Sequence, residues 1–229
     1  MYQHIVVVMA PAASAEIAEE LRGLVDDVVT DSSNTHTRSL AIKQALEADA
    51  DTIQYCDLDR LIRWVETRPD ELRETVAAID GQDVVIIGRT EQAFNTHPHA
   101  LKDTETAINA LFSHLAGVKV DIGSGSKSFS RKAAQVIMEH GQSDYAPTTD
   151  AEWLALCYHA GFEISTVWVD GLDWESADQF RESAADAATQ KAAADAYDQR
   201  TESWQFRVNM MTRIIQGGLD IWDKHKSKK

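Results

Sequence analysis

Two carboxylates, Asp57 and Asp59, follow directly on a β-rich run at residues 52–56. In an extended chain, residues two positions apart point to the same side, so both carboxylates would face one ligand at the carboxyl end of a buried strand. Ligands of open α/β sheets bind in the crevice at these strand ends. Two hard oxygen ligands favour Mg²⁺ or Mn²⁺, which takes its remaining ligands from water and substrate phosphates. The competing interpretation is a solvated helix start, with Asp59 near the N-cap.

The elements that would position this pair alternate between short β-rich runs and longer helical patterns. Runs dense in Val, Ile and Tyr are typical of strands buried on both faces. Strands are predicted at residues 5–9, 27–30, 52–56, 84–88, 118–122 and 163–169. Helices are predicted at residues 14–24, 39–48, 102–115, 130–140 and 150–159, with another opening near Pro69 and a turn at residues 123–126. This alternation predicts an α/β fold with a Rossmann-type, mostly parallel sheet flanked by helices.

The last part of the chain has a different pattern. Residues 175–216 are Ala-rich and helical, with Trp204, Val208, Met211 and Ile215 recurring at three- and four-residue steps. We expect this stripe to pack on the main domain or on a second copy of the chain, which would make a homo-oligomer. The sequence therefore predicts a sheet-containing domain at residues 1–170 and a long C-terminal helical extension at residues 171–229.

The chain is acidic, with 22 Lys and Arg residues against 37 Asp and Glu residues and a net charge of −15. Phosphate contacts need clustered Lys and Arg, so this charge argues against nucleic acid and favours small molecules or proteins as partners. A diphosphate ligand would need a metal ion or a local basic pocket. No apolar run approaches the ~20 residues of a membrane span. Cys56 and Cys157 lie in apolar runs, as expected of reduced thiols, and no signal-peptide pattern opens the chain, so we expect a cytoplasmic protein.

Several segments, taken in order, resemble a known family. The first strand ends in a Pro-containing loop at residues 8–11, and the second ends in an acidic residue within residues 28–33. A helix rich in Arg, Ala and Leu precedes the strand that ends in Asp-Leu-Asp. Further matching segments are residues 85–89, 120–131, 149–153 and 160–164. Over residues 4–170 the chain resembles the nucleotide-sugar glycosyltransferases of the GT-A fold, especially the family 2 and dolichol-phosphate-mannose-synthase-like enzymes.

The resemblance implies transfer of one sugar from a nucleotide diphosphate donor to a hydroxyl acceptor, with inversion. Asp57 and Asp59 would bind Mn²⁺ or Mg²⁺, which holds the diphosphate and stabilises the leaving nucleotide. An inverting enzyme also needs a carboxylate base for the acceptor proton, and by position this is Asp150, with Glu152 as the second candidate. Capping of the helix that starts there is an equal alternative for Asp150.

The resemblance also implies contacts to the nucleotide sugar. Asp31 would accept a hydrogen bond from the nucleobase, and Pro11 lies in the first-strand loop beside the nucleotide. Arg38, Lys43 or Arg89 would offset phosphate charge. Arg60 and Arg63, next to the Asp pair, would neutralise it. The donor sugar, the nucleobase, the acceptor and the choice between inversion and retention stay open.

A second hypothesis is a catalytically inactive GT-A-like domain that binds a ligand or acts as an assembly module through its C-terminal helix. The first-strand loop lacks the polar residues that many members of the family place near the nucleotide. The Gln-x-x-Arg-Trp signature of processive synthases and the Gly-rich fingerprints of P-loop and dinucleotide-binding enzymes are absent. His97 and His99 lack a third metal ligand at a fitting spacing, so we expect them in a surface loop.

Overall fold

The computed structural model describes residues 1–31, 37–143 and 145–226, and in this part of the chain the strands form two separate sheets. The strands of the small sheet, β1 (Val6–Met9) and β2 (Asp27–Thr30), are parallel and are connected through α1 (Ala15–Arg22). The main sheet has the spatial order β3 (Thr52–Cys56), β5 (Ser126–Ser130), β4 (Val84–Arg89) and β6 (Ile164–Val169). The predicted α/β class is confirmed, while Ser32 and Ser33 of the second matching segment lie outside the described residues.

The main sheet is mixed, so the prediction of a mostly parallel sheet is wrong for this sheet. β5 runs antiparallel to both β3 and β4, whereas β4 and β6 are parallel. The strand predicted at residues 118–122 is also wrong, because the short helix η1 (Ile122–Ser124) precedes β5. Gly125 connects them with a φ of +71°. The sequence of β5, Ser-Lys-Ser-Phe-Ser, lacks the apolar run that indicates a buried strand.

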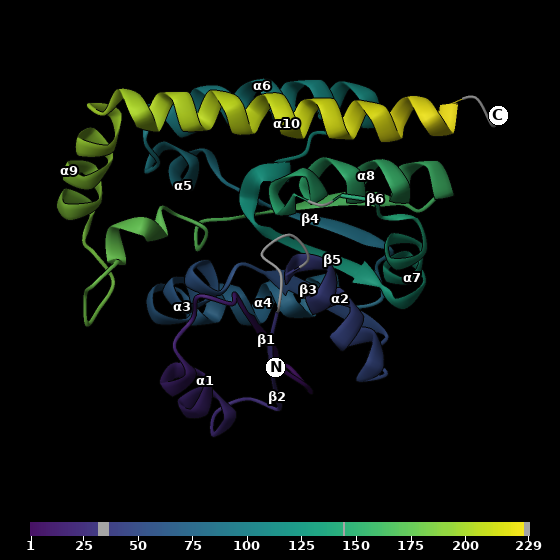
Figure 1. Ribbon diagram of the computed structural model, residues 1–229, viewed down its shortest axis with the longest axis horizontal. Helices are drawn as coiled ribbons and strands as arrows, with labels where there is room; N and C mark the ends of the chain where they lie inside the picture. Colours follow the sequence, from purple (N-terminus) through teal and green to yellow (C-terminus); the bar gives the residue numbers. More distant parts are fainter. Residues whose placement is uncertain (32–36, 144, 227–229) are drawn as a thin grey trace.

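Helices cover both faces of the main sheet (Figure 1). α3 (Leu58–Thr67) and α4 (Pro69–Ile79) pack on one face, against Val85 and Ile87 of β4. Ile86 of the same strand points to the other face, where it meets helices α6 (His99–Ala116), α8 (Thr149–Ala160) and α10 (Thr201–Lys226). The remaining helices are α2 (Thr37–Glu47), α5 (Glu91–Asn95), α7 (Arg131–His140), η2 (Ala146–Thr148), η3 (Glu175–Asp178) and α9 (Ala187–Asp198). Two covered faces explain why all six residues of β4 are buried.

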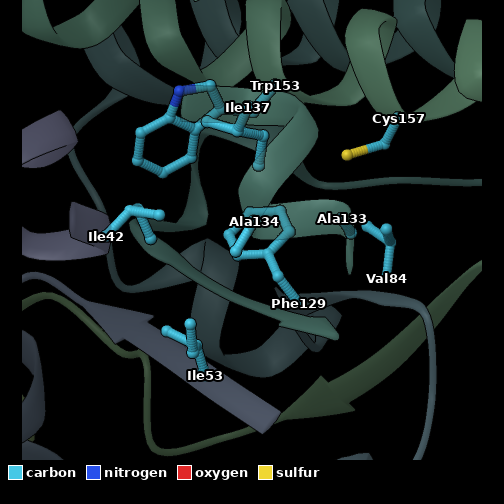
Figure 2. Close-up of a cluster of buried hydrophobic side chains, with 9 residues drawn as sticks. All are labelled: Ile42, Ile53, Val84, Phe129, Ala133, Ala134, Ile137, Trp153 and Cys157. Atoms are coloured by element: carbon cyan, nitrogen blue, oxygen red, sulfur yellow. The ribbon is translucent and has the colours of Figure 1, made fainter. Parts of the chain in front are cut away.

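The core cluster around Trp153 fixes α8 to the sheet (Figure 2). The ring of Trp153 meets those of Tyr55 on β3 and Phe129 on β5 edge-on, with centroids 5.6 Å apart in both pairs. Ile42, Ile53, Val84, Ala133, Ala134, Ile137 and Cys157 complete the cluster. These contacts set the start of α8 beside the carboxyl end of β3. Cys157 and Cys56 are free thiols, as predicted.

α10 lies next to α6 and packs on α8 (Figure 1). Gly218 permits the close approach, because a Cβ atom there would lie 2.4 Å from Cζ of Phe112. The predicted packing of the C-terminal stripe on the main domain is confirmed for Met211 and Ile215, whereas Val208 is exposed. No helix among the described residues combines the length and apolarity that crossing a membrane requires.

Candidate functional site

Asp57 lies at the junction of β3 and α3 and is the N-cap residue of this helix. Its backbone N–H donates to the carbonyl of Gly125 at 2.9 Å, which ties the end of β3 to the turn before β5. Its side chain makes no capping hydrogen bond. The carboxylate instead accepts hydrogen bonds from Tyr55 Oη at 2.5 Å and from Arg38 Nη2 at 3.2 and 3.4 Å. Asp57 is therefore directed away from the helix and towards α2.

The electrostatic environment keeps Asp57 ionised. Burial by itself would raise the pKa of Asp57, but the guanidinium groups of Arg38 and Arg60 outweigh burial and lower this pKa below its ordinary value. Arg60 Nε lies 3.9 Å from Asp57 Oδ2. Gly125 makes this arrangement possible, because a Cβ atom there would lie 2.6 Å from Asp57 Oδ2 and 2.9 Å from Arg60 Nε.

Asp59 is oriented differently from Asp57. The expectation that residues 57–59 continue as an extended chain is wrong, because α3 begins at Leu58. Residues two apart in a helix do not face the same side. Asp59 is exposed, and its Oδ1 accepts the backbone N–H of Arg60 at 2.9 Å. The helix start therefore separates the two carboxylates that the sequence placed together.

Asp150 lies in the first turn of α8 and is 6 % exposed. Lys127 Nζ, from β5, contacts its Oδ1 at 2.6 Å, and Arg38 Nη1 contacts the same oxygen at 3.0 Å. Lys127 is itself buried and also donates to the carbonyl of Ile122 at 2.8 Å. Through Arg38, the structure thus brings together Asp57 and Asp150, which the sequence assigned to metal binding and to base catalysis.

Glu152 faces a different part of the molecule. It is 2 % exposed, and its Oε1 accepts the backbone N–H groups of Gln142 at 2.6 Å and Ser143 at 3.0 Å. Burial raises the pKa of Glu152, and these hydrogen bonds offset the rise only in part. Glu152 holds the loop after α7 against α8 and is not brought into the cavity that Asp150 lines.

Arg89, at the end of β4, has a fully buried guanidinium group. Its Nε and Nη2 donate to the two oxygens of Asp121 at 2.8 and 2.7 Å, and Nη2 also donates to Glu105. Burial by itself would lower the pKa of Arg89, but the two carboxylates raise it above its ordinary value. Arg89 therefore neutralises buried carboxylates, and the structure does not place it where a phosphate could reach it without rearrangement.

Asp31 and Pro11 follow the two strands of the small sheet. Asp31 follows β2, and its backbone N–H donates to the carbonyl of Met9 at 2.9 Å. Its Oδ2 accepts the hydroxyl of Thr37 at 2.9 Å, next to Arg38 at the start of α2. Pro11 is exposed in the turn after β1. Asp31 thus lies close to the end of α2 that carries Arg38. Among the described residues, Pro11 makes no polar contact with Arg38, Asp57 or Asp150.

A cavity of about 180 Å³ lies between the carboxyl end of β3 and the C-terminal helix α10. Three of the predicted site residues, Arg38, Asp57 and Asp150, line it. The full lining is Arg38, Asp57, Arg60, Thr104, Glu105, Ile108, Ile122, Gly123, Pro147, Asp150, Arg207, Met210, Met211 and Ile214. The cavity therefore has a charged side at the strand ends and an apolar side formed largely by α6 and α10.

The side chains around Asp57 do not fit the predicted Mn²⁺ or Mg²⁺ site. The carboxylate already faces Arg38 and Arg60, and a divalent cation placed there would be repelled by both guanidinium groups. These hard cations also need several oxygen ligands, but the predicted second ligand, Asp59, is directed to the backbone of α3. Within residues 1–31, 37–143 and 145–226, no group of three or more His, Cys, Asp and Glu is arranged to hold a metal ion.

Sequence reasoning missed three charged residues of this region: Lys127, Glu105 and Arg207. For Lys127 a signal existed, because Ser-Lys-Ser-Phe-Ser alternates large and small residues with the period of a strand. Glu105 and Arg207 lie on helices whose surface charge pattern does not distinguish them from solvated residues.

His97 is also placed differently from the prediction of a surface loop. It is 2 % exposed, and its Nδ1 lies 3.1 Å from the carbonyl of Ala93. Burial lowers the pKa of His97 well below its ordinary value, and the neighbouring guanidinium groups of Arg89 and Arg60 lower it further. The imidazole is therefore neutral.

No protein-family model, no curated protein and no solved structure matches this chain.

Proposed function

We propose that this chain transfers a glycosyl group from a nucleoside diphosphate sugar to a hydroxyl acceptor. The observation that carries the proposal is the convergence of Asp57 and Asp150 on Arg38, in one cavity at the carboxyl end of β3. Open α/β sheets bind their ligands at strand ends. The cation Arg38 can stabilise the negative charge of the nucleoside diphosphate as it leaves. A carboxylate beside it can take up the proton of the acceptor hydroxyl.

Arg38 is the proposed phosphate contact. A guanidinium group forms charge-assisted, bidentate hydrogen bonds with phosphate oxygens. The side chain of Arg38 is 16 % exposed, so an entering ligand can reach it. Thr37, the preceding residue, connects this end of α2 to Asp31, the proposed nucleobase contact. The diphosphate would replace the carboxylates as the partner of Arg38.

Asp150 is the proposed general base. Lys127 and Arg38 both contact Oδ1, so we assign proton transfer to Oδ2. When Arg38 binds the diphosphate, Asp150 loses one of its two cationic partners. Donor binding would thereby free one side of the Asp150 carboxylate to face the acceptor hydroxyl. The proposed reaction uses Arg38 as the phosphate partner and routes no step through a metal ion.

Calorimetric titration with UDP and with GDP, in EDTA and in Mn²⁺, tests the proposal. We expect one of the two nucleotides to bind in EDTA. Arg38→Gln should weaken this binding about ten- to a hundredfold, because a hydrogen bond to a charged group contributes ~1.5–3 kcal/mol. Arg131→Gln is the matched control, since Arg131 also joins α2 to its neighbours but lies outside the cavity. If neither UDP nor GDP binds to the protein, in EDTA or in Mn²⁺, the proposal is refuted.

A ligand-binding module without activity is the second candidate, and one observation favours it. Asp150 is buried and its carboxylate is already held by Lys127 Nζ at 2.6 Å, as in a structural ion pair. Release of UDP or GDP from sugar nucleotides separates the two functions. Turnover that Asp150→Asn abolishes while nucleotide affinity is kept favours the transferase. Nucleotide binding with no turnover by the unaltered protein favours the module.

A further inference from the structure

An open groove lies along the outer side of α7, away from the cavity at the strand ends. Its volume is about 610 Å³, and its lining comes from α7, from the end of α2 and from the turn after α8. The lining residues are Leu46, Lys132, Gln135, Val136, Met138, Glu139 and Phe162. None of them lines the cavity that contains Asp57 and Asp150, so this groove is a separate feature of the molecule.

The α7 groove does not have the character of a small-molecule site. Such sites combine a concave apolar wall with a few polar groups fixed to point at the ligand. Here the charged side chains, Lys132 and Glu139, are exposed. Among the described residues, no buried polar atom without a hydrogen-bond partner belongs to the lining. Leu46, Met138 and Phe162 are half-buried at the edge of the core. The groove is therefore suited to packing against another protein surface.

The two charged residues of the groove lie on the same side of α7. Lys132 and Glu139 are seven residues apart, which is close to two helical turns and a rise of about 10.5 Å. Within the described ranges, Lys132 forms no ion pair, and Glu139 forms one, with the adjacent His140 at 3.8 Å. Both charges are therefore free to pair with a partner that lies along the helix.

These charges oppose the dipole of their own helix. α7 begins at Arg131 and ends at His140, so Lys132 lies in its first turn and Glu139 in its last. A helix favours acidic residues in the first turn and basic residues in the last. An antiparallel copy of α7 would bring its own Glu139 to the first turn and its own Lys132 to the last. The charge pattern is thus unfavourable in a single chain and favourable in an antiparallel pair.

The net charge of the chain also restricts which face a second copy can approach. Each chain carries −15, so two copies repel each other over most of their surfaces. The α7 groove is locally neutral, with one cation and one anion. A uniformly acidic or basic partner would face one like charge here, whereas an identical helix in the opposite direction matches both. The apolar stripe of α10 is not available for such a contact, because Met211 and Ile215 pack inside the molecule.

We infer that two copies of this chain associate through the α7 groove, with their α7 helices antiparallel about a two-fold axis. A two-fold contact is self-complementary, so Lys132 of each copy meets Glu139 of the other. The axis passes close to Gln135 and Val136, midway between the charges. Val136 and Met138 supply apolar contacts on either side of the exposed ridge. This surface is independent of the proposed function, because it shares no lining residue with the cavity.

Sedimentation-velocity ultracentrifugation of the full chain, over a concentration series, tests the inference. An interface centred on one helix is small, so we expect a reversible dimer with a dissociation constant in the micromolar range. Lys132→Glu and Glu139→Lys each place like charges at both contacts and should each weaken the dimer about ten- to a hundredfold. An equimolar mixture of the two variants should restore the affinity of the unaltered protein, because both contacts again join opposite charges.

Lys191→Glu is the matched control. It changes the net charge by the same amount as Lys132→Glu, but Lys191 is 75 % exposed on α9, which lies at the opposite end of the molecule from α7 (Figure 1). We expect this variant to dimerise like the unaltered protein. In the unaltered dimer, a carbodiimide should also couple Lys132 to Glu139 between the two copies, since these residues lie two turns apart within one chain.

A chain that stays monomeric well above micromolar concentrations overturns the inference. A dimer that either charge reversal leaves intact overturns it as well, and so does a dimer that Lys191→Glu weakens equally. If the mixture of the two variants does not restore the dimer, the helices are not paired in this way and the inference is wrong. If a variant does not fold, as checked by circular dichroism, the cross-link in the unaltered dimer decides, because its absence excludes the antiparallel pairing.

Discussion

Substitution of Gly125 by Ala should damage the candidate site through a single methyl group. Gly125 adopts φ +71°, and a Cβ atom there would lie 2.6 Å from Asp57 Oδ2 and 2.9 Å from Arg60 Nε. Neither side chain can move freely, because Asp57 is held by Arg38 and Tyr55 and Arg60 by a backbone carbonyl. The methyl group must therefore break at least one of these contacts.

The structure offers a matched control at Gly117, the C-cap of α6. Gly117 has the same φ of +71°, but a Cβ atom there would meet nothing within 4 Å. Gly117→Ala should therefore show only the cost of a left-handed backbone, ~1–2 kcal/mol. Gly125→Ala should show the same backbone cost plus the loss of a charged hydrogen bond, ~1.5–3 kcal/mol, for a total of about 2.5–5 kcal/mol.

Urea denaturation of the two variants measures the difference, and nucleotide titration provides a second readout. We expect Gly125→Ala to lose more unfolding free energy than Gly117→Ala and to bind UDP or GDP more weakly, while Gly117→Ala keeps the affinity of the unaltered protein. Equal destabilisation by the two substitutions would refute the reasoning, because it would mean that the methyl group at residue 125 displaces nothing of consequence.

Three other substitutions have expected outcomes. Lys127→Met leaves buried Asp150 with Arg38 as its cationic partner and should lower the unfolding free energy measured in urea by ~3–5 kcal/mol. A loss below ~1 kcal/mol would show that Arg38 alone is enough to neutralise Asp150. The pKa of His97 is lower in the folded than in the unfolded protein, so the unfolded chain takes up the extra proton as the pH falls below ~6.5. Between pH 7 and 5, the His97→Phe variant should therefore lose less unfolding free energy than the unaltered protein, by up to ~1.4 kcal/mol per pH unit. Parallel curves of unfolding free energy against pH for the two proteins would contradict this. Glu152→Gln should keep nucleotide affinity within twofold in calorimetry, because Glu152 holds a loop outside the cavity, and a tenfold loss would place it in the site.

The position of Asp57 could be predicted from local pattern alone. The run at residues 52–56 has the composition of a buried strand, and the residue after such a strand lies at the sheet edge where ligands bind. The orientation of Asp59 could not be predicted this way. Asp-Leu-Asp is compatible with an extended chain and with a helix start, and the packing of α3 on the sheet selects the helix.

The pairing of charges could not be predicted from the sequence. Arg38, Lys127 and Asp150 meet although they lie far apart along the chain, and Arg89 pairs with Asp121 instead of facing a ligand. Ion pairs have no periodicity that a sequence window can detect. Which carboxylate meets which cation depends on strand order and helix docking.

Local side-chain chemistry and hydrophobic periodicity were enough to establish the acidic character of the chain, the α/β class, the strand that ends at Asp57 and the apolar stripe of the C-terminal helix. The antiparallel insertion of β5, the neutralisation of Asp150 by Lys127 and the closure of the cavity by α10 became visible only in the folded molecule. The physical reason is that these features arise from contacts between residues distant in sequence. A strand of Ser and Lys is stable at the centre of a sheet because its neighbours supply backbone pairing and a buried carboxylate, and neither is encoded in the strand itself.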